Sequence, residues 1–580
     1  MAGNDLSDPF EWAEKRLERE LWPREREFIV SGGWARSNDL NWADLRSPEV
    51  ATDENRFDAR LIRWLLTKDL PGVTCRHEGV ELWGLWIGNK LDLEEVDCGR
   101  SLKANACVFE APPLLQDAHL KHLFLQGSIL PGLNAHRLTC AGNVFLRKGL
   151  ESNGLVDLAG ARIAGTLDCI GSTLSVTEGR ALNCDAAVIG AAVFLSDGFT
   201  ATGEVNFVGA KITGQLSCDG GSFSALQGRA LNCDSAVIGA NVFLRNGFTA
   251  TGEVNFVRTE VTGNLRCRSA KIEGVFDAEG AKIGGGFFWE EISGAVEALD
   301  LTETSVSRLT DDTASWACVE TAKLSGFRYD SIQSDMTVQD RLALLARKGE
   351  RTLTSPTTKP STRRDFDPQP YSQLAKVYES MGHRIDAAKV RFARDERLMW
   401  AAFARAMAQS KPDTFGKGTA ILSLIWGRIY RDTFGFGHAP FKALRTALLI
   451  LIATWWLSDQ TYQRGEFAPA SPVVLTSAEW LDASQQGCKA QQVEGCTMPL
   501  QLWEQSTAYR DYETFSPALY ALDLFLPLDT LGQEDAWAPS KDRGAFGLTL
   551  YWARWAVQLS GWLLLATAAA VFTGVLGKKD

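Results

Sequence analysis

Apolar residues between Gly79 and Thr302 come in short dyads that are separated by Gly, Ala and Asn. The apolar positions recur at steps of five or six residues, whereas a helix needs a period near 3.6 and a flat strand a period of 2. Such steps predict a right-handed quadrilateral parallel β-helix, with one short strand per side and about 20 to 22 residues per coil. The predicted inward residues are Phe207, Ile212, Cys218, Phe223, Phe256, Val261, Cys267, Ile272, Ala278 and Ile283.

An internal duplication points to the same architecture. Residues 180–208 recur as 229–257, with 25 of 29 positions identical at an offset of 49 residues. A fixed period of this size indicates a solenoid, whose units bury their apolar faces against their neighbours. We therefore predict a pentapeptide-like solenoid over 71–347, in which each 49-residue repeat is two coils plus a few extra residues. The same offset relates Phe145, Phe194 and Phe243, and also the predicted buried thiols Cys169, Cys218 and Cys267.

The regions that flank the predicted solenoid have helical patterns. Apolar stripes in 8–28 and 55–68 predict an N-terminal helical cap over 1–70, which would cover the open strand edges of the first coil. Residues 348–369 are polar and rich in proline, so we interpret them as a linker. Residues 370–411 have the pattern of a helical hairpin that resembles one tetratricopeptide-like unit, and we expect it to pack on the solenoid end or at the membrane surface.

Two apolar segments predict transmembrane helices, at 439–458 and 554–577. Residues 555–577 contain no charge, and 23 residues at about 1.5 Å each suffice to span a bilayer core of about 30 Å. The first segment spans only if Lys442 and Arg445 extend to the headgroup region. Residues 412–438 are expected to form an interfacial helix on the inner face. The remaining predicted membrane anchors are the aromatic residues Trp455, Trp456, Trp552 and Trp555.

The charge distribution predicts the orientation of these segments. Lysines and arginines precede the first segment and follow the second, whereas residues 459–553 hold 5 basic and 13 acidic side chains. The positive-inside rule therefore places both termini in the cytoplasm and 459–553 outside it, in a bacterial inner membrane. Residues 1–30 are too charged for a signal peptide, in agreement with a cytoplasmic N-terminus. Cys488 and Cys496 lie in the outer loop, where oxidation is allowed, and we predict a disulfide between them.

An apolar stretch at 515–532 interrupts the outer loop. It is too short to span, so it is either an interfacial helix or a re-entrant segment between the two predicted spans. A re-entrant segment with acidic residues is also the plan of many cation pores. The candidate residues at this membrane interface or pore are Pro517, Pro527, Asp523 and Asp529.

The composition excludes some function classes. The formal net charge of -11 argues against a nucleic-acid binder, because such proteins need a basic surface. No Gly-x-Gly-x-x-Gly follows a strand, and no catalytic, metal or cofactor motif is visible, so we expect no enzymatic activity and no cofactor. The expected partners are the lipid bilayer and a protein that contacts the cytoplasmic solenoid, with self-association into a homo-oligomer as a further option.

Several segments resemble one family. These are 154–167, 125–133, 371–378 and 520–533, which are similar to segments of bacterial membrane-associated proteins with degenerate pentapeptide-like repeats. Members of that family are often labelled membrane-associated oxidoreductases. The resemblance implies the solenoid and the membrane location. We therefore expect a membrane-anchored scaffold, and the alternative is an oligomeric channel-like or effector protein with the solenoid as its sensor.

Overall fold

The computed structural model describes residues 8–37, 51–349, 366–409, 414–439, 441–488, 497–526 and 531–572. The chain divides into two compact units. The solenoid unit is Met1–Val390 and the helical unit is Arg391–Asp580.

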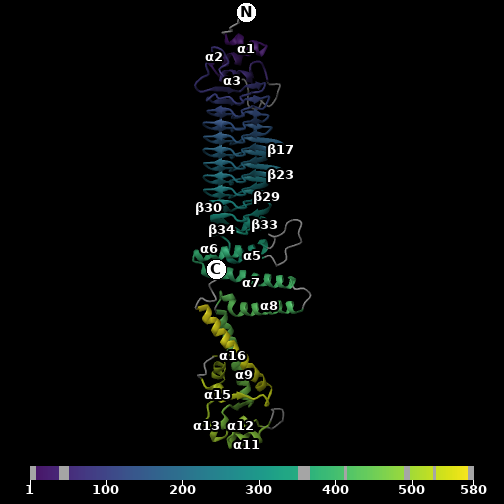
Figure 1. Ribbon diagram of the computed structural model, residues 1–580, viewed down its shortest axis with the longest axis vertical. Helices are drawn as coiled ribbons and strands as arrows, with labels where there is room; N and C mark the ends of the chain where they lie inside the picture. Colours follow the sequence, from purple (N-terminus) through teal and green to yellow (C-terminus); the bar gives the residue numbers. More distant parts are fainter. Residues whose placement is uncertain are drawn as a thin grey trace. The chain divides into compact units, whose positions relative to one another are not determined.

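The solenoid unit contains a parallel β-solenoid of about 11 turns, from β3 (Val80–Trp83) to β34 (Arg328–Ser334) (Figure 1). One coil consists of four short strands, of which two belong to a first sheet and two to a second sheet. Each strand pairs in parallel with the strand in the same position of the next coil. In one coil the four strands are β11 (Thr139–Cys140), β12 (Val144–Phe145), β13 (Glu151–Ser152) and β14 (Val156–Asp157).

The predicted inward positions form the core of this solenoid. All ten residues that the periodicity selected are buried, and none is more than 4% exposed. Phenylalanines of neighbouring coils contact each other inside the solenoid, because Phe199, Phe223 and Phe248 lie with ring centroids 5.3 and 5.2 Å apart. The thiols of Cys169, Cys218 and Cys267 are also fully buried, and burial raises their pKa values far above the ordinary thiol range.

The 49-residue repeat consists of one long and one short coil. Strand register pairs Leu167, Val193, Leu216 and Val242 in succession, so consecutive coils contain 26, 23 and 26 residues. These coils are longer than the expected 20 to 22 residues because their second-sheet strands contain inserted residues. The insertions lie within β17 (Thr173–Asn183) and β23 (Ser222–Asn232), where the pairing shifts between Ser175 and Arg180 and between Ser224 and Arg229 (Figure 1).

One corner of each coil has a residue in the left-handed backbone region. Four glycines occupy this corner, but the other coils place larger residues there at φ values near +55°. The corner is therefore fixed by the stacking of coils and not by glycine alone. In order along the chain the corner residues are Glu95, Asp117, Arg137, Gly160, Ala186, Gly209, Ser235, Arg258, Gly280, Glu303 and Gly326.

Helices cover both ends of the solenoid (Figure 1). The N-terminal end carries α1 (Pro9–Leu17), α2 (Pro23–Ser31) and α3 (Ala59–Leu66). At the other end the last strand stops at Ser334, and α5 (Val338–Gly349) begins within the range that the sequence assigned to the solenoid. Next to it, α6 (Gln369–Ser380) donates hydrogen bonds from Gln369 and Gln373 to the carbonyl oxygens of Phe327 and Tyr329, at 3.1 and 2.6 Å.

A buried ion pair holds α5 on the last coils. The guanidinium of Arg341 donates to both carboxylate oxygens of Asp311, at 2.7 and 2.8 Å, and only 4% of the Arg341 side chain is exposed. Trp316, in α4 (Thr313–Ala317), donates its indole N–H to the same carboxylate at 2.7 Å. Burial lowers the pKa of Arg341, but the neighbouring Asp311 outweighs it and the net pKa is raised.

The helical unit begins within α7 (Arg384–Gln409), which starts in the solenoid unit. It continues with α8 (Thr414–Phe434), α9 (Phe441–Gln463) and α16 (Ala545–Phe572). Between α9 and α16 lies a small domain with an aromatic core that includes Phe467, Trp480, Trp503, Tyr520 and Trp537. Its elements are β35 (Phe467–Pro469), α10 (Pro472–Leu475), α11 (Ala478–Gln486), α12 (Pro499–Trp503), α13 (Thr507–Arg510), α14 (Pro517–Phe525), α15 (Gln533–Ala536) and β36 (Trp537–Pro539).

Candidate functional site

Large apolar side chains are exposed on three helices of the helical unit. Monomeric soluble proteins rarely expose a contiguous apolar patch of more than a few hundred Å². The described part of these helices therefore has a surface that is typical of contact with lipid or with another protein. The exposed residues are Ile421, Leu422, Ile425, Trp426 and Ile429 on α8; Phe441, Leu444, Leu448, Leu449, Ile452, Trp455 and Trp456 on α9; and Leu548, Trp552, Trp555, Leu559, Trp562, Leu563 and Leu565 on α16.

One helix in the described part of the chain is long and apolar enough to cross a membrane, and it is α9. The sequence predicted two such helices. The second predicted span, 554–577, falls on α16, whose described part begins earlier, at Ala545, includes Arg554 and ends at Phe572. Of the two predicted membrane-length helices, the described residues therefore confirm one, α9, and not the second.

The predicted membrane anchors all lie on two of these helices, α9 and α16. Lys442 is in the first turn of α9, with its ammonium nitrogen 4.4 Å from the ring centroid of Phe392, and Arg445 is exposed one turn later. Trp455 and Trp456 are about half exposed on α9, as is Trp555 on α16. Trp552 is 67% exposed. Their role as membrane anchors stays a prediction.

A sharp corner joins α8 to α9. Gly435, Phe436 and Gly437 all have positive φ values, which allow the chain to turn within three residues. The ring of Phe436 packs against Phe392 with centroids 5.6 Å apart. His438, just after the corner, has its Nε2 atom 2.8 Å from the Asp395 carboxylate. Burial raises the pKa of Asp395, but the hydrogen bonds from His438 and Arg394 outweigh it and the net pKa is lowered.

The described part of the apolar stretch 515–532 contains α14, Pro517–Phe525, which packs on both long helices, α9 and α16. A side-chain carbon at Gly561 of α16 would overlap the carbonyl oxygen of Phe525, so glycine permits this close approach. A cavity of about 230 Å³ lies between Leu451, Ile452 and Trp455 of α9 and Ala518, Ala521 and Leu522 of α14. Both alternatives left open by the sequence, an interfacial helix and a re-entrant segment, are compatible with this packing.

Asp523 lies inside the fold. Its side chain is 4% exposed, and its carboxylate accepts backbone N–H bonds from Leu531, Gln533 and Glu534 at 3.3, 2.9 and 2.9 Å. The carboxylate thus binds the backbone at the start of α15. Pro517 is the first residue of α14, where its fixed φ favours helix initiation. The other two candidate residues, Pro527 and Asp529, lie outside the described residues.

Cys488 forms a disulfide. Its predicted partner, Cys496, lies outside the described residues, so the pairing itself stays a prediction. Ten cysteines of the solenoid unit are free thiols, and seven of these are buried.

A polar ladder that the sequence analysis did not identify runs along the solenoid. Each member accepts a hydrogen bond from the backbone N–H two residues ahead, which fixes the adjacent corner. Amide side chains also bond along the ladder, since Asn206 donates to Asn183 and Asn183 donates to Asp157, both at 2.9 Å. The signal in the sequence is an Asn or Asp in each of seven successive coils, at Asp157, Asn183, Asn206, Asn232, Asn255, Asp277 and Asp300.

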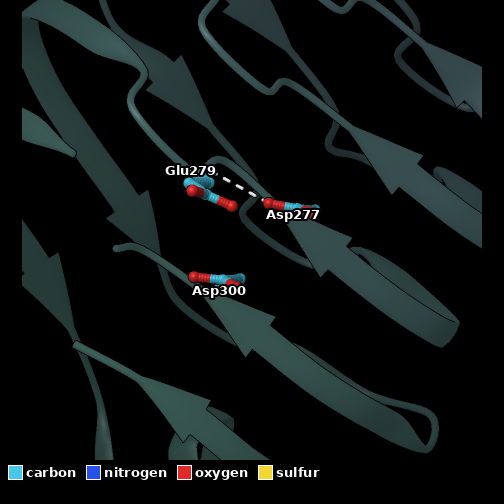
Figure 2. A group of neighbouring side chains, drawn as sticks. All are labelled: Asp277, Glu279 and Asp300. Atoms are coloured by element: carbon cyan, nitrogen blue, oxygen red, sulfur yellow. Dashed lines mark hydrogen bonds between the residues drawn. The ribbon is translucent and has the colours of Figure 1, made fainter. Parts of the chain in front are cut away.

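The ladder ends in an acidic cluster, which Figure 2 shows. Oxygen atoms of Asp277, Glu279 and Asp300 all lie within 4.8 Å of one another. Asp277 is paired in register with Asp300, and Asp300 with Lys323 in the next coil. The ammonium of Lys323 is 2.7 Å from Asp300 and supplies a positive charge to the cluster. Carboxylates at this spacing suit a hard divalent cation, but the lysine also explains their proximity.

Asp277→Asn should stabilise the solenoid at pH 7, by less than about 1 kcal/mol because the site is half exposed and screened. Burial, and then the nearby Asp300, Glu253 and Glu279, raise the pKa of Asp277. Its ionised form therefore opposes folding, and this cost disappears as the pH falls below its pKa. Thermal unfolding at pH 7 and pH 4 checks the prediction, because the gain should be present only at pH 7. A gain of equal size at both pH values would contradict it.

Comparisons with protein-family models, with curated proteins and with solved structures found no match to this chain.

Proposed function

We propose that this chain is a membrane-anchored scaffold, without enzymatic activity, that presents its solenoid to a protein partner. The observation that carries the proposal is the exposed apolar surface of α8, α9 and α16. Exposure of this kind is costly in water and favourable in lipid.

In the proposed arrangement α9 is the first spanning helix and the predicted span 554–577 is the second, of which residues 573–577 lie outside the described residues. The exposed side of α8 would lie on the inner surface, with α14 as a re-entrant segment. The proposal places both termini in the cytoplasm of a bacterial cell and residues 459–553 outside. The charge distribution supports this orientation, and so does the disulfide at Cys488, because disulfides persist outside the cytoplasm.

The resemblance to bacterial proteins with pentapeptide-like repeats supports a right-handed, four-sided solenoid as part of the proposal. Solenoids commonly use their extended surfaces to bind other proteins. Asp523 does not support the channel-like alternative, because its carboxylate accepts hydrogen bonds from three backbone N–H groups.

Alkaline carbonate extraction of cell membranes tests the anchoring. The full chain should stay in the membrane fraction. Leu449→Arg should increase the extracted fraction, because an arginine in mid-membrane costs about 2.5–3.5 kcal/mol on insertion scales. Leu449 is 60% exposed on α9, and Val30→Arg, at a 77% exposed position of α2, is the matched control that should change nothing. If the unmodified chain is extracted as readily as a soluble protein, the anchoring proposal is wrong.

A further inference from the structure

The first sheet of the solenoid has an outer surface with two adjacent columns of side chains. One column contains Arg162, Val188, Lys211, Val237, Glu260, Lys282, Ser305 and Arg328, which are paired in register from coil to coil. The other contains Phe145, Asp168, Phe194, Ser217, Phe243, Arg266 and Phe288. We call these two columns together the basic-aromatic face.

The four phenylalanines of this face point outward. Each is half-buried, whereas the residues before and after it in the strand are buried in the core. Arginines lie over their rings: Arg147 over Phe145 and Arg245 over Phe243, both at 4.3 Å, and Arg266 over Phe288 at 4.9 Å. The face therefore combines apolar area with oriented cations.

The face has more positive than negative charge available to a partner. Arg162, Lys211, Arg266 and Arg328 form no side-chain hydrogen bond or ion pair with the described residues. The nearby acids Asp168, Asp219, Glu260 and Glu291 are already paired, with Arg147, Arg245, Lys282 and Arg268. Asp197, near Phe194, is an exposed carboxylate that accepts a hydrogen bond from Ser196. Glu290 is a further carboxylate at its edge, and burial raises its pKa. This surplus contrasts with the net charge of -11 of the whole chain.

The duplicated repeats differ mainly at this face. Residues 180–208 and 229–257 differ at four positions, and three of these lie within three residues of Phe194 or Phe243. They are Ala192 against Asn241, Ser196 against Arg245 and Asp197 against Asn246. The arginine that stacks on Phe243 is thus absent beside Phe194. The face varies in chemistry along the solenoid while its coils stay the same.

We propose that the basic-aromatic face binds an extended, acidic polypeptide segment of another protein. Equivalent residues two coils apart, such as Arg162 and Lys211, are separated by about 10 Å, which is about three residues of an extended chain. Acidic residues at about every third position would meet the unpaired cations, and apolar residues between them would meet Val188, Val237 and the phenylalanines. This inference names the partner surface of the scaffold, so it rests on the proposed function.

Charge spacing favours a polypeptide over a nucleic acid. Each strand of duplex DNA carries a phosphate about every 3.4 Å, so cations spaced by about 10 Å would neutralise few of them. Exposed valines, such as Val188 and Val237, at 38% and 41% exposure, also find apolar contacts in a polypeptide that a phosphate backbone lacks.

Selection of a phage-displayed random peptide library on the purified full chain tests the inference. The selected peptides should combine acidic with apolar residues. Their binding, measured by fluorescence anisotropy, should weaken at least 10-fold for the double variant Arg162→Glu, Lys211→Glu, and also for Val188→Asp. Arg229→Glu, which reverses an exposed charge on the second sheet, is the matched control and should leave binding unchanged. Circular dichroism checks that each variant keeps its β-structure.

Three results would overturn the inference: no enriched peptides, enriched peptides without acidic residues, or binding that the face variants do not change. If a labelled 20-base-pair DNA binds and this binding depends on Arg162 and Lys211, the partner of the face is a nucleic acid and not a polypeptide. Membrane extraction of the same variants separates this inference from the anchoring proposal, since the face variants should remain membrane-bound. If the chain binds peptides but is readily extracted from membranes, the basic-aromatic face is a binding surface and the anchoring proposal is wrong.

Discussion

Arg341→Ala is expected to destabilise the last coils of the solenoid by about 3–5 kcal/mol, because it leaves the buried Asp311 carboxylate without its counter-charge. Asp311 is 2% exposed and would keep only the N–H bond from Trp316 among its side-chain partners in this region. Coils of a solenoid contact only their neighbours, so the effect should be local. Hydrogen exchange of β32 (Ser305–Asp311) and β34 should accelerate, while that of the central coils should not.

Two variants provide the controls. Arg268→Ala removes a pair with Glu291 in which both side chains are more than half exposed, and it should have no measurable effect. Replacing both buried partners, in Arg341→Met with Asp311→Leu, should restore much of the lost stability, since no charge is then left buried. If Arg341→Ala behaves like Arg268→Ala, the ion pair does not hold α5 in place.

Asp523→Ala is the second change with a large expected effect. It leaves three backbone N–H groups at the start of α15 without their acceptor, at a total cost of about 3 kcal/mol or more if water does not replace it. The small domain between α9 and α16 should then become sensitive to limited proteolysis and should unfold at a lower temperature. Asp523→Asn keeps one acceptor oxygen and should cost less.

Asp523→Asn also separates this structural role from a role in ion conduction. If the purified protein conducts ions in planar bilayers, and this variant abolishes conduction without loss of stability, the capping explanation is wrong. If the protein does not conduct, the stability difference between the two variants at position 523 measures the capping contribution.

The core of the solenoid was predictable from the sequence because its apolar spacing follows directly from the shape of a coil. Phe207, Ile212 and Cys218 face inward as the periodicity indicated. The positions of the corners were not predictable from the glycines in the sequence. Most corner residues, such as Glu95 and Arg137, adopt positive φ values because neighbouring coils impose them.

Contacts between distant parts of the chain were also beyond the sequence analysis. Arg341 and Asp311 are 30 residues apart, and no local pattern distinguishes them from the many exposed ion pairs of the solenoid. The acidic cluster arises because Asp277 and Asp300 fall at the same position of successive coils, which the register reveals. The membrane anchors Trp455 and Trp552 were predicted from the long apolar runs in which they lie, and their role stays a prediction.

Because the long coils carry their extra residues in the second sheet, the second sheet accepts insertions that the first sheet does not contain. Extra residues enter through β17 and β23 of the second sheet, with exposed glycines at Gly179 and Gly228. The first-sheet strands of the same coils keep a two-residue pairing from coil to coil. Addition of another long and short coil would therefore lengthen the basic-aromatic face without interrupting it. The tips near Gly179 and Gly228 are accordingly the natural positions for an inserted tag or fluorescent reporter, because chain added there extends away from both the core and the proposed binding surface.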